Sequence, residues 1–129
     1  MRPWLLALTL PMMALHPLTS VSAAVTEADF RLQKAGDLVA VCSPERGDPL
    51  LTAAINFCQG FTVGVYRTLS QEQAAMRSKL FCPSEPTPSR NQAIMDFVRW
   101  AKGNPSVMNE NPADAVLHYL VERYPCRTR

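Results

Sequence analysis

The chain has 129 residues, of which 47% are hydrophobic and 19% are charged, and its formal net charge is +2. A chain of this size forms one domain, and it contains no internal repeat or low-complexity tract. It also lacks a basic run, an aromatic-basic alternation and an acidic tail, so it does not predict binding to nucleic acid or to an anionic membrane surface.

Residues 1–23 have the composition of a secretory signal peptide. Arg2 precedes an apolar run from Trp4 to Leu15, and small residues follow up to Ala23. This pattern predicts cleavage after Ala23, or one residue later, and release of a soluble periplasmic domain over residues 24–129. The alternative is a retained membrane anchor, but the apolar run is about 12 residues long, whereas a membrane span needs ~20.

The first helix is predicted over about residues 26–41. Thr26 is a residue type that is favoured at helix N-caps, and Asp29 lies in the first turn. One stripe at helical spacing contains the apolar residues Phe30, Ala35, Leu38, Val41 and Cys42.

The second helix is predicted to begin at Asp48-Pro49, where an N-cap residue precedes a proline at the first helical position. Its predicted buried stripe consists of Leu51, Ala54, Ile55, Cys58, Phe61, Val65 and Leu69. Gly60 and Gly64 lie four residues apart beside this stripe, which predicts that another helix backbone approaches closely. The polar stretch from Ser70 to Lys79 tolerates a helix, so the helix either continues there or ends.

Prolines interrupt the next segment, and the third helix is predicted over about Pro88 to Lys102 with Thr87 as its N-cap. Its predicted buried residues are Ile94, Phe97, Val98 and Ala101. Asn111-Pro112 predicts the start of a fourth helix, which ends at Pro125-Cys126. The apolar face of this helix consists of Val116, Leu117, Leu120, Val121 and Tyr124. The predicted fold is therefore all-α, a compact bundle of about four helices.

The four cysteines, Cys42, Cys58, Cys82 and Cys126, predict two disulfides that staple this bundle. An even number of cysteines in a small exported chain, without a Cys-x-x-Cys pair, is typical of a disulfide framework. Two antiparallel helices joined by a short loop return their outer ends to one place, which favours Cys82–Cys126 and leaves Cys42–Cys58. Three connectivities exist, and the spacing does not exclude the other two.

No arrangement of residues predicts an enzyme, a metal site or a cofactor. The smallest gap between cysteines is sixteen positions, whereas a zinc site usually contains a tight pair. His118 remains after His16 leaves with the signal peptide, and we interpret it as a partly buried or surface residue. A Cys58–His118 dyad is the alternative, but it would leave a second cysteine unpaired. The carboxylates are scattered and show no paired signature for acid–base catalysis.

Three motifs surround the cysteines. Residues 57–64 form an aromatic-Cys-x-Gly-x-x-x-Gly segment, residues 81–83 form a Phe-Cys-Pro turn, and residues 124–126 end the last helix with Tyr-Pro-Cys. Over about residues 27–126 the chain thereby resembles the Rap/Tai family of immunity proteins associated with type VI secretion. Trp100 departs from the aliphatic residue expected there, and it is either a core aromatic, which we favour, or an exposed anchor.

The resemblance implies both a fold and a function. Members of this family are small, exported, all-helical proteins that bind peptidoglycan amidase effectors in the periplasm. It therefore implies a stoichiometric, homodimeric inhibitor that occludes the active site of a secreted amidase. The recurring residues are scaffold positions, so no contact residue can be transferred. Two alternatives stay open, namely a small periplasmic helical chaperone of the acid-stress type and an envelope adaptor of unknown partner.

An inhibitor needs a rigid projection that carries aromatic or arginine anchors. The candidate projections are residues 43–48, 70–88 and 102–111. Within the second, Arg77, Lys79 and Phe81 combine positive charge with an aromatic ring, and we expect these three residues to contact the partner. The alternative for each segment is an ordinary solvated connection.

Overall fold

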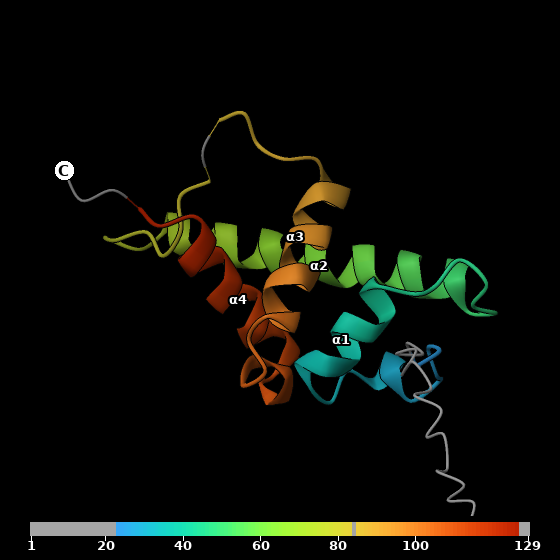
Figure 1. Cartoon of the computed structure of the whole chain (residues 1–129). Helices are drawn as coiled ribbons and strands as arrows, with labels where there is room; N and C mark the ends of the chain where they lie inside the picture. The colour runs from blue at the N-terminus through green and yellow to red at the C-terminus, as the bar shows by residue number, and fades with distance from the viewer. Residues whose placement is uncertain (1–22, 84, 127–129) are drawn as a thin grey trace, which may run out of the picture.

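The computed structural model describes residues 23–83 and 85–126 (Figure 1). The predicted signal peptide lies, except for its last residue, outside the described residues. Within them the chain forms only helices, which are η1 (Asp29–Arg31), α1 (Ala35–Cys42), α2 (Leu51–Ala74), α3 (Arg90–Lys102), η2 (Val107–Asn109) and α4 (Pro112–Arg123). The predicted all-α bundle with four α-helices is confirmed. None of these helices combines the length and the apolar character that crossing a membrane requires.

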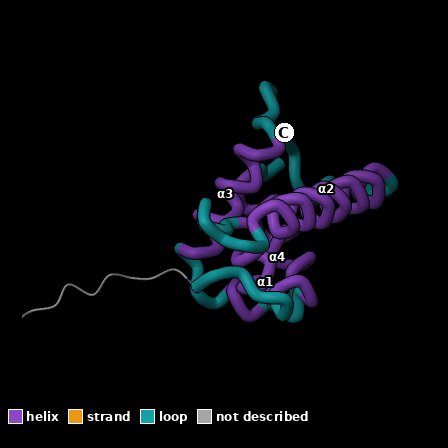
Figure 2. The backbone as a smooth tube through the Cα atoms, turned by 90° about the vertical axis from the view of Figure 1, so that its right-hand side faces the viewer, coloured by secondary structure: helices purple, strands orange, loops and turns teal. Residues whose placement is uncertain are grey.

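The long helix α2 is the element on which α1, α3 and α4 all pack. It runs behind the other helices in Figure 1, and the turned view in Figure 2 shows that it extends past them. Ala54 and Cys58 of α2 are buried against Leu38 and Val41 of α1 in one continuous core. The remaining buried apolar residues of this core come mainly from α3 and α4, and they include Phe97, Val98, Ala101, Ala115, Val116, Tyr119 and Leu120.

The first predicted helix is wrong over its N-terminal half. Asp29 accepts hydrogen bonds from the backbone N–H of Thr26 at 2.7 Å and from its hydroxyl at 2.8 Å, so Thr26 donates and does not cap. Leu32 has φ 49°, in the left-handed region where a right-handed helix cannot continue. The α-helix begins only at Ala35, whose N–H donates to the carbonyl of Glu110 at 2.8 Å.

The second helix begins at Leu51, two residues after the predicted first helical residue Pro49, and its N-cap position is Leu50 and not Asp48. The Asp48 carboxylate accepts from the N–H of Leu50 and from the N–H of Val25, each at 2.7 Å. The residue therefore closes a turn before the helix and ties the start of the described chain to it. The helix ends at Ala74. It therefore continues into the first part of the polar stretch 70–79 and stops within it.

The last two helices, α3 and α4, are each capped by a side-chain oxygen, and one of the two capping residues differs from the prediction. Ser89, and not Thr87, caps α3, because the Ser89 hydroxyl accepts from the N–H of Gln92 at 3.3 Å. Asn111 caps α4 as predicted, accepting from the N–H of Ala113 at 2.9 Å, with Pro112 at the first helical position.

Both favoured disulfides are confirmed. Cys42–Cys58 and Cys82–Cys126 have Cα–Cα distances of 5.1 and 4.9 Å and join positions 16 and 44 residues apart. In the loop-entropy model, loops of these lengths stabilise the folded state by about 3 and about 4 kcal/mol. These values are a large share of the ~5–15 kcal/mol typical of a whole domain.

Within the described chain, the expectation that another helix approaches Gly60 and Gly64 is wrong. A Cβ atom built at either residue would meet no atom within 4 Å, and both residues are exposed. The reason is helical geometry, because two residues correspond to about 200° around the axis, which turns Gly60 away from the buried Cys58. Ile55 was predicted to be buried but is exposed. Its neighbour Ala54 faces the core, and the next residue on a helix points about 100° away from that direction.

We predict that Gly60→Ala and Gly64→Ala each raise the free energy of unfolding of the monomeric chain by about 0.5–1 kcal/mol, because alanine restricts the unfolded chain and meets no obstacle. Denaturant unfolding measures this change. Gly36→Ala is the control, since a Cβ at Gly36 would lie 3.3 Å from the Met108 carbonyl oxygen, and we expect a smaller gain or a loss. Destabilisation by Gly64→Ala would instead indicate that another chain covers this face.

Candidate partner-binding site

Residues 75–81, which we call the basic loop, connect the end of α2 to Cys82. Arg77 and Lys79 are exposed there, as are the large apolar side chains of Met76 (46% exposed) and Leu80 (39% exposed). Figure 1 shows the loop projecting past the end of α2 beside the C-terminal end of α4. The loop therefore presents two cations and two apolar groups together on the surface.

The base of the basic loop is held by the side chain of Gln73. This residue is 8% exposed, and its amide oxygen accepts from the N–H of Leu80 at 3.1 Å and from the N–H of Phe81 at 3.2 Å. One buried side chain thereby joins the two ends of the loop. Sequence reasoning missed Gln73, because it lies in a polar stretch in which nothing distinguishes it from its neighbours.

Two further links attach the loop to α4. The N–H of Cys82 donates to the carbonyl of Tyr124 at 2.8 Å, and the Cys82–Cys126 disulfide follows directly. Because backbone bonds, a side-chain amide and a covalent bridge all act within a few residues, the loop has little freedom at its base.

The structure separates the three residues expected to contact a partner. Arg77 and Lys79 lie on the surface, but Phe81 is 0% exposed and belongs to the core, with its ring centroid 6.0 Å from that of Tyr66. The expectation that the Phe81 ring faces outward is corrected accordingly. Phe81 anchors the loop from inside, and Met76 and Leu80 provide the exposed apolar surface instead.

A shallow groove lies between the basic loop and the end of α4. Its lining consists of Arg77, Ser78, Lys79, Leu80, Cys82, Val121, Pro125 and Cys126. Val121, predicted to be buried on the apolar face of α4, is 40% exposed and lies in this groove. No carboxylate is among the lining residues, so the groove suits a partner surface that is partly apolar and negatively charged.

The other two candidate projections are less available. In the segment 43–48 the carboxylate of Asp48 is bound to two backbone N–H groups, although residues 45–47 are exposed. The segment 102–111 contains the buried Val107 and donates from the Asn104 side chain to the Trp100 carbonyl at 2.7 Å. Val107 therefore anchors the segment 102–111 to the core, while Lys102 and Asn109 stay exposed.

Trp100 and His118 have the roles that we favoured. Trp100 packs against the core, with ring centroids 6.3 Å from Phe97 and 5.6 Å from Tyr119. His118 is a surface residue whose Nδ1 lies 3.6 Å from a carboxylate oxygen of Glu110. The Cys58–His118 dyad is excluded, because Cys58 is bonded to Cys42.

The site offers no metal-binding cluster. Over the described ranges 23–83 and 85–126, no three residues among His, Cys, Asp and Glu are grouped so that they could hold a metal ion. All four cysteines are in disulfides, so none can act as a thiolate ligand or nucleophile.

We predict that Gln73→Ala lowers the free energy of unfolding by about 1–3 kcal/mol, because it leaves two backbone donors without their acceptor. Chemical denaturation measures the loss, and hydrogen exchange at the amides of Leu80 and Phe81 should accelerate selectively. Gln71→Ala is the matched control, since Gln71 is exposed on the same helix and should change stability by under ~0.5 kcal/mol. Equal effects of the two substitutions would show that Gln73 does not hold the loop.

Comparison with known proteins gives one result. A family model described as Rap1a immunity proteins matches residues 34–126. No curated protein and no solved structure matches the chain. The matched range includes the four α-helices, both disulfides and the basic loop.

Proposed function

The chain belongs to the family of Rap1a immunity proteins, and we propose that it is a periplasmic, non-enzymatic inhibitor of a type VI secretion effector, specifically a peptidoglycan amidase. Membership of an immunity family supports a protein partner. The predicted signal peptide supports the periplasm, and the resemblance of the cysteine motifs supports the amidase. The single structural observation that carries the proposal is the basic loop, a cationic projection with a fixed base.

Such a loop would inhibit an enzyme by occupying its active site, so the inhibitor needs no catalytic residue of its own. A loop held by Gln73 and by the Cys82–Cys126 disulfide loses little conformational entropy on binding, so more of its contact energy becomes affinity. Arg77 and Lys79 would pair with carboxylates around the cleft, while Met76 and Leu80 would enter it and exclude the substrate. The effector would stay folded and be blocked by occupation of its active site.

We extend the proposal to a homodimer formed along the open face of α2. Gly60 and Gly64 leave a strip of backbone that no part of the described chain covers. A second copy of α2 could approach there closely, in an interface that a two-fold axis makes self-complementary.

We predict that Gly64→Arg converts such a dimer to a monomer without unfolding it, since the new side chain points into open space in the single chain. Sedimentation velocity measures the mass, and circular dichroism checks the fold. Lys102→Arg, at an exposed position on α3, is the control. A wild-type protein that sediments as a monomer at about ten times the concentration expected in the periplasm would exclude the dimer.

We predict that the double reversal Arg77→Glu/Lys79→Glu weakens effector binding at least about tenfold, which is ~1.4 kcal/mol, while the melting temperature is unchanged. The effector is first captured from secreted and periplasmic extracts of the native strain with the oxidised protein, identified by mass spectrometry, and then titrated by calorimetry. Arg31→Glu/Lys34→Glu makes the same change of net charge at two exposed positions on the N-terminal side, and it should leave the affinity unchanged.

The outcomes separate the alternatives. Recovery of a cell-wall amidase at near-equal stoichiometry, with affinity lost only in the loop variant, supports the proposal. Unchanged affinity in the loop variant removes the basic loop from the interface. Recovery of a single partner other than an amidase overturns the amidase assignment, and recovery of many unrelated proteins that increases at low pH would favour the chaperone.

A further inference from the structure

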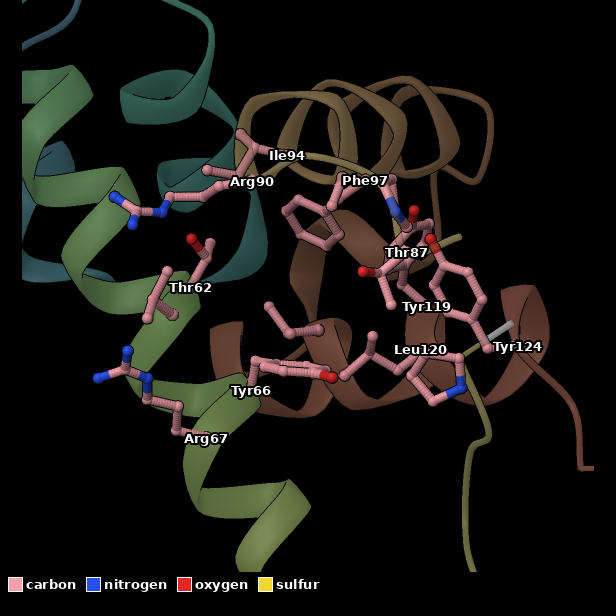
Figure 3. A pocket seen from close by; sticks show the side chains of 15 residues that line it. Thr62, Tyr66, Arg67, Thr87, Arg90, Ile94, Phe97, Tyr119, Leu120 and Tyr124 are labelled. Carbon is pink, nitrogen blue, oxygen red and sulfur yellow. The ribbon is translucent and has the colours of Figure 1, made fainter. Parts of the chain in front are cut away.

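A second concave surface lies on the other side of the Cys82–Cys126 disulfide from the basic loop. It is a cavity of about 350 Å³ between α2, α3, α4 and the segment that follows Cys82 (Figure 3). Pro83 and Tyr124 line it, while their neighbours Cys82 and Pro125 line the groove beside the basic loop. The two concave surfaces are therefore adjacent, and one partner could cover both.

The walls of this cavity are mainly apolar. Ile94 and Phe97 of α3 face Tyr66 of α2 and Leu120 of α4 across it (Figure 3). Phe97 and Leu120 are buried in the core, so this part of the wall does not move without disturbing the fold. A cavity of this size, at the lower end of the ~300–1,000 Å³ range of ligand pockets, accommodates one large apolar side chain.

Positive charge lies at one end of the cavity. Figure 3 shows Arg67 of α2 and Arg90 of α3 on either side of Thr62. Arg90 donates to the neutral side-chain oxygen of Gln59 at 3.3 Å, and neither arginine forms a salt bridge within the described residues. No carboxylate is among the lining residues, so this charge is available to an anion that enters with the ligand.

We propose, building on the function proposed above, that this cavity receives a segment of the effector in which a large apolar side chain lies next to a carboxylate. The apolar side chain enters between Phe97 and Leu120. The carboxylate pairs with Arg67 and Arg90. Buried aromatic walls with arginines at the rim are the composition of binding hot spots in protein interfaces.

The contribution of Arg67 and Arg90, which form the rim of the cavity, to effector binding is tested by the double variant Arg67→Glu/Arg90→Glu. Its affinity for the same effector is measured by calorimetry. We expect at least a tenfold loss of affinity that diminishes as salt is added, since salt screens the charge pairs. The Arg31→Glu/Lys34→Glu variant is the control for net charge. An unchanged affinity in the rim variant, together with a loss in the basic-loop variant, overturns the cavity proposal and leaves the proposed function standing.

Two other outcomes are also decisive. If neither the rim variant nor the basic-loop variant changes the affinity, or if no effector is captured, both the proposed function and this inference fail. If the rim variant changes the sedimentation of the unbound protein and not its affinity for the effector, the occupant of the cavity is a second copy of this chain, and the inference is wrong.

Discussion

The attachment of the chain after α2 to the end of α4 determines how the rest of the molecule can be used. Phe81 brings this segment into the core, and burial of a side chain of this size stabilises the fold by about 2–3 kcal/mol. The neighbouring Cys82–Cys126 disulfide closes a sequence separation of 44 residues. Since α3 and α4 both lie within that separation, their packing on α2 and the position of the basic loop depend on the same attachment.

This attachment explains why the two concave surfaces occur side by side. Phe81 is buried, whereas Arg77, Lys79 and Leu80 of the same loop are exposed. On the other side of the disulfide, Pro83 leads away from the core over the space between α2 and α3. The cavity lies there because the connection to α3 passes beside this space and does not fill it. A partner with an acidic and apolar surface would meet complementary groups in both places.

The long helix α2 serves different purposes on its two faces. Ala54 and Cys58 are small enough to let α1 pack closely, and the Cys42–Cys58 disulfide secures that contact. The opposite face carries Gly60 and Gly64 in a position where no side chain of the described residues reaches them. Glycine in a helix interior costs about 0.5–1 kcal/mol relative to alanine, so two uncovered glycines destabilise the single chain. Association with a second copy along this face, as proposed above, would offset this cost.

Features that depend on short-range chemistry could be predicted from the residues alone. Helical periodicity and capping residues such as Asn111 were sufficient to predict the all-α bundle, and the positions of the cysteines relative to helix ends were sufficient to favour both disulfides. Arg77 and Lys79, which the sequence analysis expected to contact the partner, are exposed, and contact with a partner stays a prediction. Only the tertiary structure decided the break at Leu32, the inward direction of Phe81, the clamp made by Gln73 and the uncovered glycines. Each of these depends on which distant residue occupies the neighbouring space, as Glu110 does for Ala35 and Tyr66 for Phe81. A periodic pattern shows which residues share a helix face, but it does not show which faces the other elements cover.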